Sequence, residues 1–278
     1  MLGVMLALTS AVGWGSADFL GGFSTRRLSI LTVSVVSQCV GFLFAIGLVL
    51  ASGEPAPSAH VLGLGLVAGV AGMLGLAALY SGLAIGPMGV VAPIAAMGAV
   101  VPVIVGLARG ERPAAVQLVG VVLATAGVIL AARHRDEAGA RVHPRAMLLA
   151  IAAALAIGVL VLLLHDAGAQ SLAWGVLMVR VGALTLLAAP FLAVRPSFAM
   201  DGRALGTLVV VGLLDSGANV LFVLASQRGL LSLIAVLASL YPVATVLLAR
   251  VVLDERLGRV QVLGVAMALS GVALIAAG

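Results

Sequence analysis

Residues 111–132 read ERPAAVQLVGVVLATAGVILAA, and residues 255–276 read ERLGRVQVLGVAMALSGVALIA. Aligned without gaps, these two stretches carry the same residue at 11 of 22 positions. In a chain this rich in Ala, Leu, Val and Gly, chance identity is about one in eight, so composition does not explain the match. The stretches lie 144 residues apart in a chain of 278. The sequence therefore predicts an internal duplication.

The rest of the chain is as apolar as this repeat. Hydrophobic residues make up 63% of it and charged residues only 9%, whereas a soluble domain is about half apolar and a quarter charged. A membrane crossing takes about 20 apolar residues, and long uniform runs indicate helices rather than strands. Breaks at glycine, proline and charged clusters predict spans at 2–22, 29–51, 60–84, 88–108, 114–132, 146–164, 172–194, 204–226, 230–250 and 257–277.

A polar stretch from Arg133 to Arg145 divides these ten spans into two sets of five. We predict two domains, residues 1–138 and 139–278. Because five is odd, the second copy must cross the membrane in the opposite sense, which is the inverted-repeat plan of secondary transporters. The predicted fold is therefore an all-α integral membrane protein with ten transmembrane helices in two inverted five-helix repeats.

Glycines recur at the same places in both copies. Gly120 and Gly127 match Gly264 and Gly271, and seven residues are two helical turns, so the two glycines of each copy share one helix face. Small residues in such positions allow two helices to approach closely. We expect these glycines to be scaffold features of spans five and ten.

All basic residues are arginines, and they gather in short segments between the apolar runs. Eleven arginines flank the odd-numbered loops and three flank the even-numbered loops. The positive-inside rule then places the odd-numbered loops in the cytoplasm and both termini outside. This distribution sets orientation in a lipid bilayer and does not favour nucleic-acid binding. A single cysteine, Cys39, excludes a disulfide framework and a cysteine-built metal site.

Further short motifs recur at corresponding places in the two halves. They are the breaks Ile85-Gly86-Pro87 and Gln227-Arg228-Gly229, Pro102 and Pro242 within the fourth helices, and Gly110-Glu111-Arg112 and Asp254-Glu255-Arg256 before the fifth. Span one adds an early Trp14-Gly15 pair. With the duplication, they resemble the drug/metabolite transporter superfamily, and specifically its EamA-type members. The two prolines do not superpose in the ungapped alignment, and span six has no counterpart of Trp14.

This resemblance implies a secondary transporter of small metabolites, amino acids or drugs. It further implies export coupled to an ion gradient such as protons, or exchange, with access alternating around a cavity between the repeats. The expected protein is a multi-pass monomer or homodimer of the plasma membrane, such as a bacterial inner membrane, without cofactor or metal. We expect no enzyme, because nucleophile-elbow and His-Glu-x-x-His motifs are missing from the sequence. The alternatives are a non-transporting membrane partner or sensor, and an intramembrane enzyme.

Ionisable residues inside the spans are the first candidates for a site, because such groups usually face a cavity or a partner. Asp215 and Asn219 are four residues apart and share one face of span eight, and Arg180 lies in span seven. Asp215 and Arg180 have two interpretations. In the first, the pair lines a cavity and responds to substrate or proton, and in the second it fixes the packing of spans seven and eight. Both can hold at once.

Asp18 and Trp14 share one face of span one, where a carboxylate beside an indole would suit a cationic or aromatic substrate. The alternative is an interfacial Asp18 that pairs with Arg26 or Arg27. The remaining predicted site residues are Gln38, Tyr80 and Tyr241. Each of these three side chains lines a cavity or forms a hydrogen bond across a helix interface.

Two other pairs of polar residues are expected at the membrane surface. Glu111 and Glu255 each precede an arginine at a helix start, where a carboxylate stabilises the positive end of the helix dipole. His165 and Asp166 are expected to end span six at the interface. We assign neither pair to substrate binding.

Overall fold

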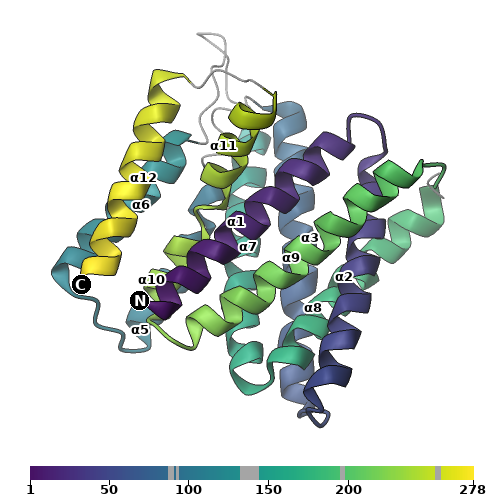
Figure 1. The fold of residues 1–278 in the computed structure, drawn as a ribbon, viewed down its shortest axis with the longest axis horizontal. Helices are drawn as coiled ribbons and strands as arrows, with labels where there is room; N and C mark the ends of the chain where they lie inside the picture. The colour runs from purple at the N-terminus through teal and green to yellow at the C-terminus, as the bar shows by residue number, and fades with distance from the viewer. Residues whose placement is uncertain (87–90, 92–93, 132–143, 195–197, 254–257) are drawn as a thin grey trace.

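The computed structural model describes residues 1–86, 91, 94–131, 144–194, 198–253 and 258–278, and these are helical with short connections. The helices are α1 (Leu2–Ser24), α2 (Ile30–Ser52), α3 (Ala59–Ile85), the 3₁₀ helix η1 (Ala96–Ala99), α5 (Val100–Ala108), α6 (Ala115–Ala131), α7 (Pro144–Gln170), α8 (Leu172–Val194), α9 (Gly202–Ser226), α10 (Leu231–Ala238), α11 (Tyr241–Leu253) and α12 (Arg259–Ala277) (Figure 1). The all-helical prediction is confirmed for the described residues.

Eight segments of the described chain are long and apolar enough to cross a membrane. Seven are single helices, and the eighth, Leu231–Val252, combines α10 and α11. Two apolar helices, Ala96–Ala108 and Ala115–Ala131, are shorter. Large apolar side chains such as Leu43, Leu50 and Val122 remain more than half exposed, as expected for a surface that faces lipid rather than water.

Spans four and nine were predicted as uniform helices, whereas span four changes from a 3₁₀ to an α-helix and span nine is interrupted within the described residues. The chain passes from η1 to α5 at Val100, and from α10 to α11 through Ser239 and Leu240. Pro102 and Pro242 then stand in the first turn of α5 and α11. Proline is tolerated there because it lacks an N–H donor that the first turn would leave unpaired, whereas inside a helix it breaks the hydrogen-bond ladder.

Span six, predicted at 146–164, lies within α7, but the helix does not end there and continues through His165 and Asp166 to Gln170. These two polar residues do not end the helix because their side chains find partners on other helices. The predicted boundary at 133–143, the break at Pro87 and the cap at Glu255 lie outside the described residues.

Close glycine contacts join α6 to α12, in line with the expected scaffold role of these glycines, although the pairing of these two helices was not predicted. A Cβ atom added to Gly127 would lie 2.7 Å from both the Cα of Ala268 and the carbonyl oxygen of Gly264. A Cβ atom on Gly271 would lie 2.6 Å from the carbonyl oxygen of Gly120. Backbone therefore meets backbone along this interface, which leaves no space for side chains.

The packing of helices repeats between the two halves. Helix α1 packs against α9 as α3 packs against α7, while α2 meets α8, α5 meets α10 and α6 meets α12. Exchanging α1, α2, α3 and α6 with α7, α8, α9 and α12 converts the α1–α9 pair into the α3–α7 pair and leaves the α2–α8 and α6–α12 pairs unchanged. Both termini and the α2–α3, α5–α6, α7–α8 and α9–α10 connections lie at one edge, which we call the lower edge (Figure 1). The α1–α2 connection lies at the opposite, upper edge.

Candidate substrate-binding site

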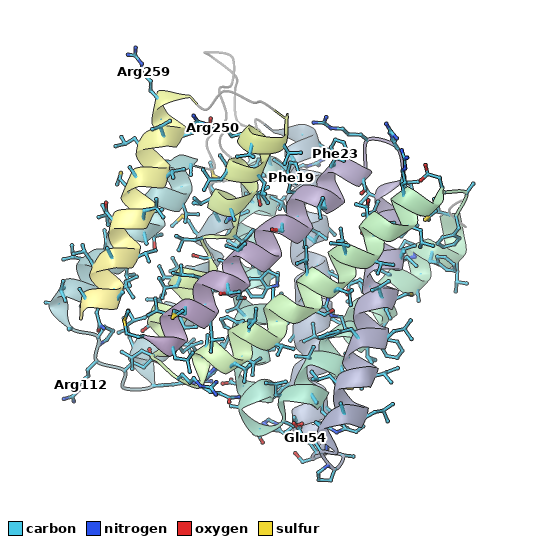
Figure 2. The ribbon with its side chains drawn as sticks, in the orientation of Figure 1. Phe19, Phe23, Glu54, Arg112, Arg250 and Arg259 are labelled. Atoms are coloured by element: carbon cyan, nitrogen blue, oxygen red, sulfur yellow. The ribbon has the colours of Figure 1, made fainter. Side chains whose placement is uncertain are left out.

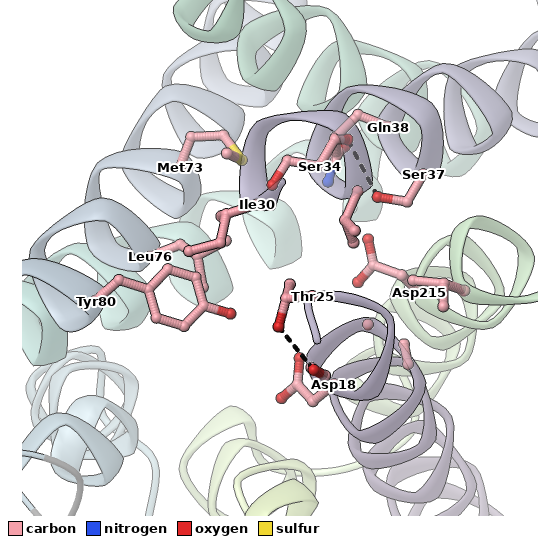
Figure 3. A pocket seen from close by; sticks show the side chains of 15 residues that line it. Asp18, Thr25, Ile30, Ser34, Ser37, Gln38, Met73, Leu76, Tyr80 and Asp215 are labelled. Carbon is pink, nitrogen blue, oxygen red and sulfur yellow. Dashed lines mark hydrogen bonds between the residues drawn. The ribbon is translucent and has the colours of Figure 1, made fainter. Parts of the chain in front are cut away.

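A cavity of about 130 Å³ lies among α1, α2, α3 and α9. Its polar lining consists of Asp18, Thr25, Ser34, Ser37, Gln38, Tyr80 and Asp215. Its apolar lining includes Met73 and Leu76 from α3. Figure 3 shows the carboxylates of Asp18 and Asp215 and the hydroxyl of Tyr80 directed into this space. The cavity thus gathers polar groups from both halves of the chain.

The cavity opens toward the upper edge. Thr25 caps the end of α1 and Ile30 begins α2, so both lining residues belong to the α1–α2 connection at that edge. Ile30 is 52% exposed and Tyr80 is 42% exposed. Both of these partly exposed residues line the same cavity as Asp18 and Asp215.

Arg180 of α8 lies behind the cavity wall and is the largest fully buried side chain of the described residues, with 2% exposure. Its Nη1 atom donates hydrogen bonds to the carboxylate of Asp215 and, at 3.0 Å, to Oε1 of Gln38. Asp215 is 30% exposed and lines the cavity. The buried guanidinium is thus neutralised by a carboxylate whose other side meets the cavity.

Only one of the three guanidinium nitrogens of Arg180 has a partner. Nε and Nη2 are buried without a hydrogen bond to the described residues. A Cβ atom on Gly41 would lie 3.2 Å from Nε, so the missing side chain at Gly41 makes room for the arginine against α2. An arginine with two unpaired donors depends strongly on its one carboxylate partner.

Asp18 is exposed to the cavity and forms no hydrogen bond or ion pair within the described part of the chain. The predicted alternative, a pair with Arg26 or Arg27, is not formed there. The guanidinium of Arg26 instead lies 5.4 Å from the centre of the Phe23 ring. Asp18 and Asp215 interact electrostatically across the cavity. Of the two carboxylates that line the cavity, Asp18 is therefore the one without a positive partner among the described residues.

Three predicted site residues lie away from the cavity lining. Trp14 donates a hydrogen bond from Nε1 to Oδ1 of Asn219 at 3.0 Å, and its ring centre lies 5.7 Å from that of Phe222. These groups join α1 to α9 beside the cavity instead of lining it. Tyr241, at the start of α11, is within electrostatic reach of Asp18. Of the eight predicted residues, the cavity lining contains Asp18, Gln38, Tyr80 and Asp215, with Arg180 behind it.

The lower edge is closed by side-chain contacts that the sequence did not reveal. Gly53 ends α2 with φ of 63°, a left-handed conformation that glycine adopts readily. The next residue, Glu54, accepts a hydrogen bond from the hydroxyl of Ser171. Its carbonyl oxygen accepts another from Nε1 of Trp174 at 3.2 Å. The α2–α3 connection is thereby fixed to the start of α8 (Figure 2).

Further contacts join α7 to its neighbours at this edge. Arg109 forms a two-pronged ion pair with Asp166 at 2.7 and 2.8 Å. These hydrogen bonds raise the pKa of the Arg109 guanidinium above its usual value. His165 shares a hydrogen bond of 2.9 Å with Ser226. Spacing along the sequence could not show these contacts, because Arg109 lies 57 residues from Asp166 and His165 lies 61 residues from Ser226.

Glu111 caps a helix of the other half of the chain, which corrects the prediction that it serves its own helix start. Gly110 adopts φ of 93° and turns the chain after α5. The Glu111 carboxylate accepts hydrogen bonds from the backbone N–H groups of Leu231 at 2.6 Å and Ser232 at 3.0 Å. These donors begin α10, where the unpaired N–H groups of a helix end favour an anion.

The Glu111→Gln substitution is expected to lower the stability of the folded protein. Glutamine keeps one oxygen acceptor but points an NH₂ group at the second backbone donor, and charge-assisted hydrogen bonds contribute about 1.5–3 kcal/mol. We expect an apparent melting temperature several degrees below that of the unmodified protein. Arg112→Gln changes a charge in the same connection without touching α10 and is the control. Equal melting temperatures for the two variants would contradict the capping role.

The fold and the cavity define a polytopic helical membrane protein with a polar chamber in its interior. The model of the EamA-like transporter family matches residues 1–133 and again residues 144–277. The chain therefore belongs to the EamA-like transporter family, and it is a multi-pass protein of a family of membrane transporters. This match confirms the predicted family.

A solved crystal structure has the same fold. It is 20% identical in sequence, with a TM-score of 0.79, and the similarity covers 98% of this chain and 95% of that one. A comparison with curated proteins gave no match. At this identity, the crystal structure supports the architecture and leaves the substrate to be inferred from the cavity.

Proposed function

We propose that this chain is a secondary transporter that moves small molecules by alternating access to the cavity between Asp18 and Asp215. The observation that carries the proposal is a polar cavity that is open at one edge and closed at the other. Glu54, Glu111 and Arg109 close the lower edge through contacts between loops and helix ends. Such contacts can break without unfolding any helix. A membrane partner or sensor would have no need of a cavity with one closed end.

The proposed architecture has ten crossings in two inverted five-helix repeats, with a domain boundary at residues 138 and 139. Two separate matches to one family model support the duplication. The exchange symmetry of the helix contacts supports a twofold relation between the halves. Inverted repeats explain alternating access, because each half can adopt the conformation that the other half has now.

We further propose that the cavity opens to the cytoplasm and that the protein exports its substrate. The helix ends and connections near the upper edge carry Arg26, Arg27, Arg145, Arg203, Arg250 and Arg259, and those near the lower edge carry Arg109, Arg112 and Arg228 (Figure 1). Figure 2 labels Arg112 at the lower edge and Arg250 and Arg259 at the upper edge. The positive-inside rule places the upper edge, with the cavity mouth, in the cytoplasm. The absence of a P-loop from the sequence favours an ion gradient, such as protons, or exchange as the driving force.

Locking the lower edge tests this proposal. Glu54 and Ser171 are replaced by cysteine in a Cys39→Ser background, and a short bifunctional thiol reagent joins them. Vesicles containing the protein are assayed with radiolabelled amino acids, nucleosides and monoamines, with and without a proton gradient. We expect flux of at least one compound, loss of that flux on cross-linking, and recovery when the cross-link is reduced. Flux that survives the cross-link would argue against alternating access, and absence of flux throughout the panel against transport.

A further inference from the structure

We propose that the cavity selects small organic monocations and that Asp18 is the countercharge for their ammonium group. This inference rests on the proposed transport function and adds the class of substrate. Asp18 points into the cavity from α1 and has neither a hydrogen-bond nor an ion-pair partner in the described part of the chain (Figure 3). An unpaired carboxylate that faces a small chamber offers a strong site for a matching charge.

The charges around the cavity leave one negative charge uncompensated. Helix α1 contributes Asp18 and α9 contributes Asp215, while the cavity-lining residues of α2 and α3 are uncharged. Asp215 is already paired with Arg180 of α8. When all three groups are ionised, they carry a net charge of minus one, so a single positive charge neutralises the site. A dication would leave an excess positive charge in a chamber with little water.

The size and the apolar wall of the cavity restrict the rest of the molecule. Met73 and Leu76 line the side of the cavity formed by α3, beside Tyr80. Methionine adapts its shape to flat or irregular ligands. An apolar cavity of roughly 150 Å³ holds benzene, and this chamber of about 130 Å³ has in addition an open mouth. A six-membered ring or a short alkyl chain with one ammonium group would fill it.

Anions and neutral molecules suit the cavity less well. The positive charge nearest to it is Arg180, which is 2% exposed and lies behind Asp215 and Gln38. A carboxylate would have to displace Asp215 before reaching it. A neutral molecule of the same shape would fill the cavity and could donate one hydrogen bond to Asp18, but it would bring no positive charge to balance the carboxylate whose water it displaces.

Benzylammonium, benzyl alcohol and benzoate form a series of similar shape and different charge that tests the proposal. Their binding to the detergent-solubilised full chain is measured by isothermal titration calorimetry at neutral pH. We expect benzylammonium to bind roughly tenfold or more tightly than benzyl alcohol, as a charge-assisted hydrogen bond allows, and benzoate to bind weakest. Equal affinity of the cation and the alcohol, or tighter binding of benzoate, would overturn the proposal without the need for any variant.

An Asp18→Asn variant locates the charge that binds the cation. We expect it to lower the affinity for benzylammonium by roughly tenfold or more and to leave benzyl alcohol unaffected. Asp201→Asn is the matched control. Asp201 caps α9 by accepting a hydrogen bond from the Ala204 amide at 2.7 Å, outside the cavity, and asparagine caps helices equally well. Undiminished binding of benzylammonium to Asp18→Asn would exclude Asp18 as the countercharge.

Flux measurements separate this inference from the proposed function. Asp18-dependent binding of benzylammonium without its movement into vesicles would support the cation site and count against transport of such cations. Flux of an amino acid or nucleoside that benzylammonium does not inhibit would support transport and overturn the substrate class. Flux of labelled benzylammonium that is lost in Asp18→Asn and kept in Asp201→Asn would support both.

Discussion

An Asp215→Leu variant is expected to lose most of its folded yield, whereas the double variant Arg180→Met, Asp215→Leu regains it. Removing Asp215 leaves Arg180 buried with the amide oxygen of Gln38 as its remaining partner. An unpaired buried charge costs about 3–5 kcal/mol, while replacing both members of a buried pair with apolar residues is close to neutral. Folded yield is measured as the monodisperse fraction in detergent, and stability as the apparent melting temperature.

The two single variants should differ, because their burial differs. Arg180 is 2% exposed, and Asp215 is 30% exposed at the cavity. Without Arg180, the Asp215 carboxylate can take hydrogen bonds from water in the cavity, so Arg180→Met is expected to be the milder change. If Arg180→Met were the more damaging variant, the assignment of the buried charge would be wrong.

The ion pair at the lower edge is a suitable control for this comparison. Arg109 is 49% exposed and Asp166 is 22% exposed, and a pair with such exposure contributes about 0–1 kcal/mol. Arg109→Met is therefore expected to change the melting temperature little.

The double variant at Arg180 and Asp215 also separates the two interpretations of the Arg180–Asp215 pair. A well-folded double variant without flux would assign the pair to transport, and one with full flux would assign it to packing.

Hydropathy predicted most of the helices because a membrane crossing has a fixed length and an apolar composition. Span 172–194 coincides with α8, and span 204–226 differs from α9 by two residues. The 3₁₀ segment before α5 and the interruption before α11 were missed, because hydropathy does not register a change of backbone hydrogen bonding. Pro102 and Pro242 were the available signal. They indicate a helix start rather than a helix interior.

The candidate site could be located in part from the sequence, because few ionisable residues lie within the spans. Asp18, Asp215 and Arg180 stand out for this reason, and the structure brings them together around one cavity. Helical spacing shows which residues share a face but not which helix that face meets. Trp14 and Asn219 were therefore assigned to the site although they bind each other beside it.

The contacts that close the lower edge were not predictable by the same reasoning. Glu54 and Glu111 each follow a glycine with positive φ at the end of a helix, and each carboxylate reaches a helix start more than a hundred residues away. A Gly-Glu pair in a connection signals a turn and a carboxylate but does not identify the partner. Tertiary packing decides that choice.

A Gly127→Leu variant is expected to prevent α6 from packing against α12. The atoms that a side chain at Gly127 would meet are backbone atoms of Ala268 and Gly264, and backbone cannot rotate out of the way. Overpacking in a core costs about 1–3 kcal/mol when side chains can adjust, so we expect at least about 3 kcal/mol here. The measurable result is a large loss of monodisperse protein and of apparent melting temperature.

Gly47→Leu is the matched control, since it makes the same substitution inside a helix. No atom lies within 4 Å of a Cβ at Gly47, and its neighbours Leu43 and Leu50 are exposed on the same outer face of α2. Leucine has a higher helix propensity than glycine by up to about 1 kcal/mol, so this variant should be as stable as the unmodified protein or more stable. Similar losses in both variants would mean that glycine is needed for helix flexibility. A loss confined to Gly127→Leu would instead establish that the duplicated glycines hold the two halves together by close backbone contact.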